Sequence, residues 1–135
     1  MEEKIYTISE VGKMFNLPAS TLRYYEELGL LPDVRRNGKK RIYTECHIAR
    51  LQAIECFKQA NLPLGKIMDF FTYEKDLKNH IDDIIEIVEG HEIEVKKQME
   101  ELEKGLSHIQ KKVRYYRAIK DSYEQGTSFP CYDSI

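Results

Sequence analysis

Apolar residues recur at helical spacing near the start of the chain, and turn-forming residues separate the repeats. One set would share a single helical face: Ile8, Val11, Met14 and Phe15. Thr7 and Glu10 have the spacing of a capping box, in which each side chain bonds the backbone amide of the other residue. Residues 16–18 end this helix, and Pro18 suits the first turn of the next. The pattern predicts a short helix, a turn and a second helix.

The second predicted helix ends at a glycine and leads into a basic hairpin. Its inner face would be formed by Leu22, Tyr25 and Leu28. Gly29 stands where a left-handed C-terminal cap belongs. Residues 33–43 are too basic and turn-rich for a helix, and Asn37-Gly38 favours a hairpin with short strands at Val34 and at 42–43. The cations around its tip are Arg35, Arg36, Lys39, Lys40 and Arg41.

Two further helices are predicted after the hairpin. Thr44 can cap the first, which would run to about Ala60 and end at Asn61. Its bulky face comprises Ile48, Leu51, Ile54 and Phe57, and a second stripe holds the small residues Ala49, Ala53, Cys56 and Ala60. Such a stripe allows another helix to approach closely. The next helix would begin around 62–64 and turn inward Leu64, Ile67, Met68 and Phe71.

From about residue 80 the apolar pattern changes to a heptad repeat. Every seventh residue is apolar or aromatic at Ile81, Val88, Val95, Leu102, Ile109, Tyr116 and Tyr123, and interleaved positions hold Ile85, Met99, Leu106 and Val113. A sustained repeat of this kind predicts a coiled coil, and a second copy of the chain is the simplest partner, in either orientation. We expect the dimerisation seam to extend from Ile81 to Tyr116. The alternative is an intramolecular helical hairpin broken at Gly90 or Gly105.

Composition and charge narrow the class of protein. The chain has 135 residues, 41% hydrophobic and 33% charged, with a formal net charge of −2. Cations concentrate at 35–41 and acids gather after residue 80, so one end of the molecule can meet phosphates. We expect a cytoplasmic protein without a secretory signal or membrane segment. Three widely spaced cysteines do not suggest a disulfide framework.

The sequence resembles the MerR family of bacterial transcription regulators. The resemblance rests on residues 8–12, on the block Thr21 to Pro32, on Arg41-Ile42-Tyr43 and on Leu62-Pro63-Leu64 ahead of the coiled coil. It implies a mainly α fold: a winged helix-turn-helix head with a small β-hairpin wing, then a long antiparallel coiled-coil dimerisation helix. The expected domains are the head at 1–75, the coil at 76–123 and a short tail at 124–135.

Candidate DNA contacts lie on the second helix and on the wing. Ser20, Thr21 and Arg23 would stand on the exposed side of the recognition helix, where they can reach bases or phosphates. Tyr24 and Tyr25 must point differently, and the resemblance favours Tyr24 for DNA. It also assigns Arg41 and Tyr43 to the wing motif that holds the DNA backbone. The remaining candidates are the wing cations Arg35, Arg36, Lys39 and Lys40.

The resemblance implies a mechanism and leaves the signal open. A dimer would bind a pseudo-palindromic site in double-stranded promoter DNA and distort the promoter spacer, and so affect RNA polymerase indirectly. Three effectors are considered. A thiol-reactive aldehyde or other electrophile could modify Cys56, which occupies the sensing position of one branch of the family, with Arg50 and Lys58 as cations able to lower the thiol pKa. The second candidate effector is a metal ion near His80, or His108, and Cys131. The third is a small organic ligand bound between the head, coil and tail.

Other classes of function are less well supported by the sequence. An architectural or excisionase-like protein could bend DNA without regulating a promoter, although such proteins usually lack a long dimerisation helix. Enzyme motifs such as a phosphate-binding glycine loop or HExxH are missing from the sequence. We expect no cofactor and no metal centre. The four histidines, at 47, 80, 91 and 108, are expected on the solvated surface.

Overall fold

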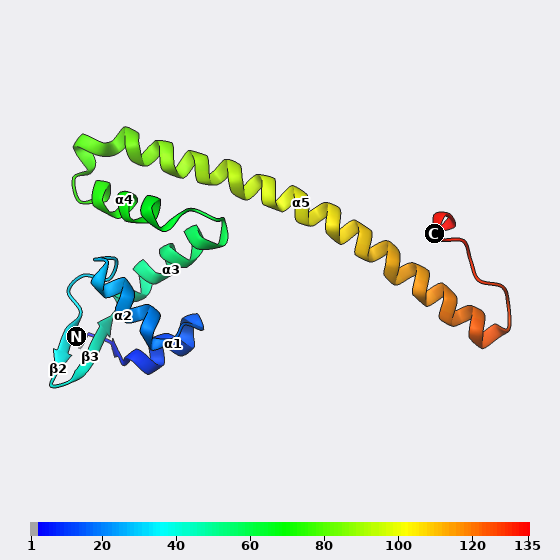
Figure 1. Ribbon diagram of the computed structural model, residues 1–135, viewed down its shortest axis with the longest axis horizontal. Coiled ribbons are helices and arrows are strands. Elements are labelled where there is room, and N and C mark those ends of the chain that lie inside the picture. The colour runs from blue at the N-terminus through cyan, green and yellow to red at the C-terminus, as the bar shows by residue number, and fades with distance from the viewer. Residues whose placement is uncertain (1–2) are drawn as a thin grey trace. The chain divides into compact units, whose positions relative to one another are not determined.

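The computed structural model describes residues 3–135. The described chain forms two compact units, residues 3–91 and Glu92–Ile135. Figure 1 shows the elements in order. The first unit holds β1 (Ile5–Tyr6), α1 (Ile8–Phe15), α2 (Ala19–Glu27), β2 (Arg35–Asn37), β3 (Lys40–Thr44), α3 (Glu45–Gln59) and α4 (Leu64–Glu74). The last helix, α5 (Leu77–Gln125), begins there and continues into the second unit, where η1 (Tyr132–Ser134) follows. The expected mainly helical fold with a small wing is confirmed.

The helix-turn-helix follows from local capping. Thr7 Oγ1 accepts from the Glu10 amide at 3.1 Å, and Glu10 Oε1 accepts from the Thr7 amide at 3.2 Å, which confirms the predicted capping box at α1. The turn after α1 is tight: the Leu17 amide donates to the Gly12 carbonyl at 2.9 Å. A Cβ at position 12 would lie 2.8 Å from the Leu17 carbonyl oxygen, so only glycine fits there without displacement.

The end of α2 and the wing depend on two glycines with positive φ. Gly29, at φ +79, follows the helix end and directs the chain so that the Leu30 amide donates to the Tyr25 carbonyl at 2.9 Å. Gly38, at φ +66, makes the hairpin turn between β2 and β3. The predicted hairpin is confirmed, although β2 begins at Arg35 and the expected strand at Val34 is wrong. The strands form an antiparallel sheet in the order β1-β3-β2.

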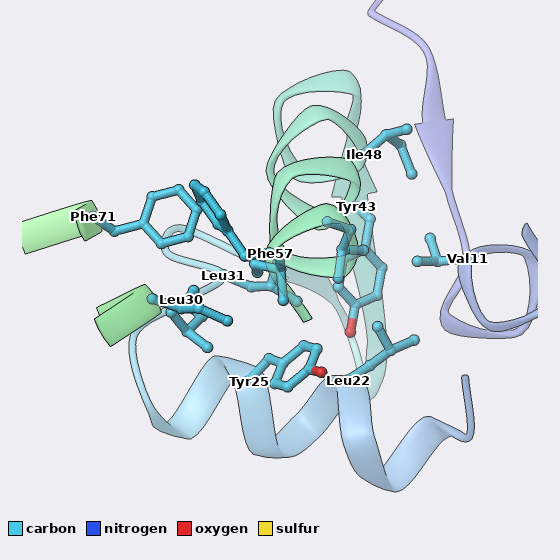
Figure 2. Packing of buried hydrophobic residues seen from close by; sticks show 12 residues of the cluster. Val11, Leu22, Tyr25, Leu30, Leu31, Tyr43, Ile48, Phe57 and Phe71 are labelled. Carbon is cyan, nitrogen blue, oxygen red and sulfur yellow. The ribbon is translucent and has the colours of Figure 1, made fainter. Parts of the chain in front are cut away.

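The core of the first unit joins α1, α2, β3, α3 and α4 (Figure 2). Its fully buried side chains include Val11, Leu22, Leu30, Leu31, Tyr43, Leu51, Ile54 and Ile67. Met14 is 51% exposed, so it does not share the burial of Val11 on the same helix. The stripe of small residues on α3 is only partly covered: Ala60 is buried, whereas Ala49 and Cys56 are exposed. Ala53, in the middle of the stripe, is half-buried against the core.

The long helix α5 keeps its heptad side chains exposed. It departs from helical geometry at His80 (φ −128, ψ 17), and neither Gly90 nor Gly105 interrupts it, so the alternative of a helical hairpin is wrong. Exposed seam residues are Ile81, Ile85, Val88, Met99, Leu102, Leu106, Ile109, Val113 and Tyr116, and Val95 is half-buried. In the second unit the tail returns onto α5, where the rings of Tyr115 and Tyr132 meet edge to face at 5.1 Å.

Candidate nucleic-acid interface

The exposed face of α2 carries the predicted recognition residues. Ser20 and Arg23 are exposed, Thr21 is half-buried and Tyr24 is 48% exposed, whereas Leu22 on the opposite face is fully buried. A polar exposed face on the second helix of a helix-turn-helix is the surface that reads the major groove in proteins of this architecture. These side chains are therefore available for base or phosphate contacts.

The structure separates the two adjacent tyrosines. Tyr25 is 3% exposed, and its hydroxyl accepts from Lys58 Nζ of α3 at 2.8 Å, an interaction that raises the pKa of Lys58. Tyr25 therefore belongs to the core, where it ties α2 to α3. Tyr24 is the tyrosine left on the surface, and its contact with DNA stays a prediction.

The wing presents cations around its turn. Arg35, Arg36, Lys39 and Lys40 are all exposed. Arg35 lies 3.8 Å from Glu3, but both side chains are more than half exposed, and such surface pairs contribute little. In the β2–β3 register Arg36 lies opposite Arg41, an unfavourable pairing of like charges. The wing is thus a surface to which an anion such as phosphate would be attracted.

Glu26 of α2 joins the recognition helix to the wing. Its Oε2 accepts from Arg41 Nε at 2.7 Å and from the Tyr43 hydroxyl at 3.1 Å. The side chains of Arg41 and Glu26 are only 20% and 17% exposed, so solvent screens this ion pair less than a surface pair. Burial, reinforced by the Glu26 carboxylate, raises the pKa of the Tyr43 hydroxyl well above its usual range. The three residues act as a clamp between α2 and β3.

This clamp changes the roles assigned to two predicted DNA contacts. The Tyr43 side chain is fully buried, so it has no surface to offer to DNA, and the prediction that it contacts DNA is corrected to a supporting role. Arg41 is half-buried and already holds Glu26. Arg41 therefore orients the wing. In the Arg36–Arg41 pair across the two strands, Arg36 is the cation exposed to solvent. The role of Glu26 could not be predicted from local sequence spacing, because Arg41 and Tyr43 lie 15 and 17 residues away from it in the chain.

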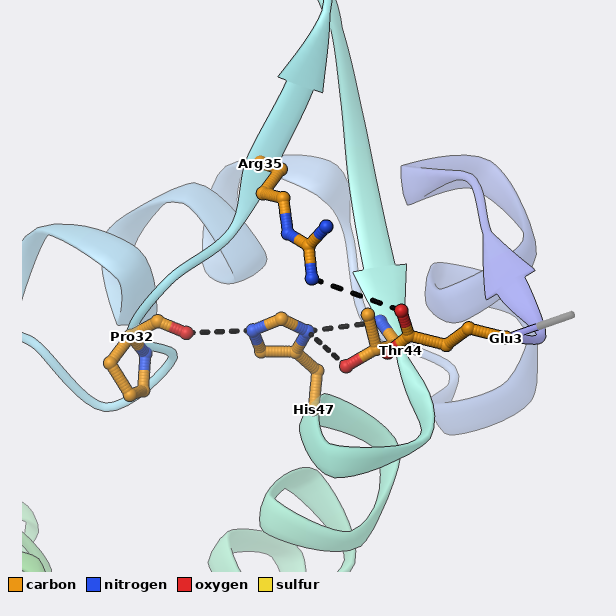
Figure 3. Close-up of polar contacts among 5 residues, drawn as sticks. All are labelled: Glu3, Pro32, Arg35, Thr44 and His47. Atoms are coloured by element: carbon orange, nitrogen blue, oxygen red, sulfur yellow. Dashed lines mark hydrogen bonds and ion pairs between the residues drawn. The ribbon is translucent and has the colours of Figure 1, made fainter. Parts of the chain in front are cut away.

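His47 also departs from expectation. It is 5% exposed rather than solvated, and Figure 3 shows its ring between Pro32 and Thr44. The Thr44 amide donates to Nδ1 at 3.0 Å, which requires the neutral ring with its proton on Nε2, and that nitrogen donates to the Pro32 carbonyl at 2.7 Å. The ring thus caps α3 and fixes the loop that leads into β2. The signal in the sequence was the capping residue Thr44, followed three positions later by His47, whose side chain can accept a hydrogen bond from the Thr44 amide.

The thiol of Cys56 lies exposed on α3, as do Cys46 on the same helix and Cys131 in the tail. The two cations expected near Cys56 are engaged elsewhere: Arg50 donates to the Leu30 carbonyl, and Lys58 donates to Tyr25. The structure therefore places Cys56 within reach of solvent without bringing either cation to it. Because its side chain is exposed in the single chain, Cys56 is not part of the buried core.

Other site chemistries find little support among residues 3–135. His80, a candidate metal ligand, pairs with Asp83 at 3.0 Å and stacks on Tyr73. Within this range no three histidine, cysteine or acidic side chains are grouped so that they could hold a metal ion. No helix in the same range is long and apolar enough to cross a membrane.

Comparison with known proteins agrees with this geometry. Residues 6–74 match the family model described as MerR HTH family regulatory protein. The chain is 32% identical over 136 aligned residues to YyaN of Bacillus subtilis (strain 168), described as an uncharacterized HTH-type transcriptional regulator, with 89% of this chain and 97% of YyaN covered.

Two solved structures resemble most of the chain. One is HiNmlR, a MerR family regulator lacking the sensor domain, bound to promoter DNA; the TM-score is 0.77 and the identity 26%, over 92% of both chains. The other is a MerR family transcriptional regulator from Bacillus thuringiensis, with a TM-score of 0.67 and 33% identity over 82% of this chain and 98% of that one. The similarity therefore extends beyond the head into the long helix.

Proposed function

The chain belongs to the MerR HTH family of regulatory proteins, and from this premise we propose that it is a transcriptional regulator that binds promoter DNA with sequence specificity. The observation that carries the proposal is the pairing of an exposed polar face on α2 with a cationic wing, held together by Glu26. The likeness to a family member described as bound to promoter DNA supports it.

In this proposal the two surfaces have different tasks. Arg23 and Tyr24, with Ser20 and Thr21, face the groove and adjacent phosphates, so they select the sequence. Arg35, Arg36, Lys39 and Lys40 bind the backbone through charge, so they supply affinity that depends on salt. Changing a residue of the first group should alter sequence preference, whereas changing one of the second should weaken all sequences alike.

The protein would act as a homodimer through α5. An unpaired helix with exposed Ile, Leu, Val and Met at heptad spacing leaves apolar area in water, and pairing with a second copy removes it. Leu102, 74% exposed, is the best test position. Leu102→Glu should shift the protein from dimer to monomer in sedimentation velocity, and Glu103→Gln, beside it and off the seam, should leave the dimer intact.

The dimer would act on the promoter by changing its shape. Two heads related by a two-fold axis bind the two halves of a pseudo-palindrome, and their spacing is fixed by the paired helices. Twisting or bending the spacer between them alters how RNA polymerase meets the promoter elements without any chemical step. Circular-permutation gel shifts would measure the bend. Straight DNA in the complex, both with and without an effector, would contradict this mechanism.

One candidate signal is modification of Cys56 by an electrophile. Its support here is the exposed thiol on α3, a helix tied to the recognition helix through the Lys58–Tyr25 bond. The expected result is that an aldehyde changes transcription with the native chain and not with Cys56→Ser. An identical response from both chains would remove Cys56 as the sensor.

The central experiment is selection of binding sites from a random DNA pool with the full-length chain. We expect a two-fold symmetric motif, and we expect Arg23→Ala to lose or relax bases within it. Lys97→Ala, a charge change on α5, serves as the matched control and should recover the native motif. Binding without any enriched sequence would favour the architectural alternative over a promoter-specific regulator.

A further inference from the structure

A pocket of about 650 Å³ opens in the first unit between α3, α4 and the loop leading into β2. Its volume falls within the range of small-molecule sites, roughly 300–1,000 Å³. The α3 wall includes two members of the small-residue stripe, Ala49, which is exposed, and Ala53, which is half-buried. Their methyl groups leave room that larger side chains would fill. The pocket is therefore a consequence of where small residues stand on α3.

Aromatic rings form the apolar side of this pocket. Phe57 meets Phe70 edge to face at 4.9 Å, and Phe70 meets Phe71 at 5.3 Å, and all three line the space. Phe57 and Phe71 are buried and Phe70 is half-buried, so the rings are held by the core rather than free to collapse inward. An aromatic ligand can add a further edge-to-face contact to this set.

Arg50 gives the pocket a polar anchor. Its Nε donates to the Leu30 carbonyl at 2.5 Å, and its guanidinium carbon lies 4.0 Å from the centre of the Phe71 ring. Its Nη2 is buried and finds no acceptor among residues 3–135. Burial lowers the pKa of Arg50, although the charge of Glu74 opposes that change. A buried donor without a partner is costly, so turning the Arg50 guanidinium until Nη2 reaches an acceptor in the pocket would be favourable.

The remaining charges decide what kind of acceptor fits. Glu3, Asp33 and Glu74 line the pocket against two arginines, Arg35 and Arg50, and Glu3 is already paired with Arg35. This acidic balance disfavours a carboxylate, whose charge the acids would repel. A protonated amine is disfavoured because an ammonium group has no lone pair with which to accept from Arg50 Nη2. A neutral oxygen, such as that of a ketone or amide, satisfies both conditions.

We propose that this pocket is an effector site of the regulator, separate from Cys56, and that it binds a small neutral aromatic compound bearing a carbonyl oxygen. The Arg50 guanidinium turns so that Nη2 donates to this oxygen, and the ring packs against the three phenylalanines. The role of this pocket as an effector site rests on the proposed function of the chain as a regulator. The pocket also touches Arg35 and His47, at the base of the wing (Figure 3), so an occupant bears directly on the segment that carries the DNA-binding cations.

The test uses acetophenone as probe, with benzoate and phenethylammonium as charged analogues. Their binding to the 135-residue chain is followed by ligand-detected NMR titration. We expect acetophenone to bind at least about fivefold more tightly than either ion, because each ion violates one of the two conditions above. Equal or weaker binding of acetophenone would overturn the assignment of ligand class.

Two matched variants locate the site. Ala49→Leu fills the pocket from an exposed helical position and should abolish binding of the probe. Gln52→Leu adds the same side chain at an exposed α3 position outside the pocket and should change affinity by less than about twofold. Arg50→Lys keeps the charge and removes the planar fork, so it should also weaken binding. Equal binding of the probe by the native chain and all three variants would overturn the proposal. Circular dichroism melts of each variant verify that it folds.

DNA binding is measured on the same samples by fluorescence anisotropy with the selected site. A probe-dependent change in DNA affinity in the native and Cys56→Ser chains, lost in Ala49→Leu, supports the effector role. A bound probe with unchanged DNA affinity overturns that role. If the chain selects a DNA motif yet does not bind acetophenone, the pocket inference fails alone; if it binds acetophenone but no DNA, the proposed function fails alone.

Discussion

Replacing Glu26 with glutamine tests whether the wing is held by the recognition helix. The substitution keeps the size of the side chain and removes the charge that Arg41 Nε and the Tyr43 hydroxyl share at 2.7 and 3.1 Å. Hydrogen bonds to charged groups contribute about 1.5–3 kcal/mol each. The amide oxygen can keep one bond, and the pair retains some exposure, so we expect a net loss of about 2 kcal/mol in unfolding free energy.

That loss is large enough to measure in two ways. It corresponds to roughly a 30-fold change in the folding equilibrium constant and to a fall in melting temperature of about 4–8 °C. Urea denaturation gives the free energy directly. Glu27→Gln is the control, because Glu27 is exposed on the same helix and loses the same charge; it should change stability by less than about 0.5 kcal/mol.

The same pair of variants separates stability from DNA binding. Both substitutions remove one negative charge near the phosphates, so their shared electrostatic gain cancels when the two are compared. We expect Glu26→Gln to bind the selected site more weakly than Glu27→Gln, because the wing is no longer held at its angle. Equal stability and equal DNA affinity of the two variants would refute the clamp. Additive effects of Glu26→Gln and Tyr43→Phe on stability would also refute it, since partners in one network should couple.

Three further outcomes are expected. Gly12→Ala should destabilise the head by about 1–3 kcal/mol because the new methyl group meets a carbonyl oxygen at 2.8 Å, whereas Gly90→Ala, with nothing nearby, should stabilise α5 by about 0.5–1 kcal/mol; urea melts of both check this. Because the pKa of Tyr43 is raised in the folded chain, the hydroxyl ionises first in the unfolded chain as pH rises. The contribution of Tyr43 to stability is therefore complete below pH 10.0 and declines above it, and Tyr43→Phe should flatten that part of a stability–pH profile. Lys39→Ala should reduce the slope of log affinity against log salt by about 1, and Lys97→Ala should leave it unchanged.

Much of the head could be predicted because its signals are local. The capping box at Thr7, the glycines at the end of α2 and in the wing, and the heptad repeat of α5 each depend on residues within a few positions of one another. Backbone sterics and capping act over that range, so the sequence alone determined a helix-turn-helix, a basic hairpin and a long helix with an apolar seam.

The tertiary structure decided the roles of particular side chains. Glu26 meets its partners across 15 and 17 residues, and Lys58 meets Tyr25 across 33, distances over which no spacing rule applies. Packing likewise buried Tyr43 and His47, which the sequence had suggested for DNA and for solvent. The pocket beside Arg50 is formed where α3, α4 and the loop leading into β2 meet. Local periodicity fixes which face of a helix is apolar, but only the meeting of several elements determines which side chains are satisfied, buried or left open.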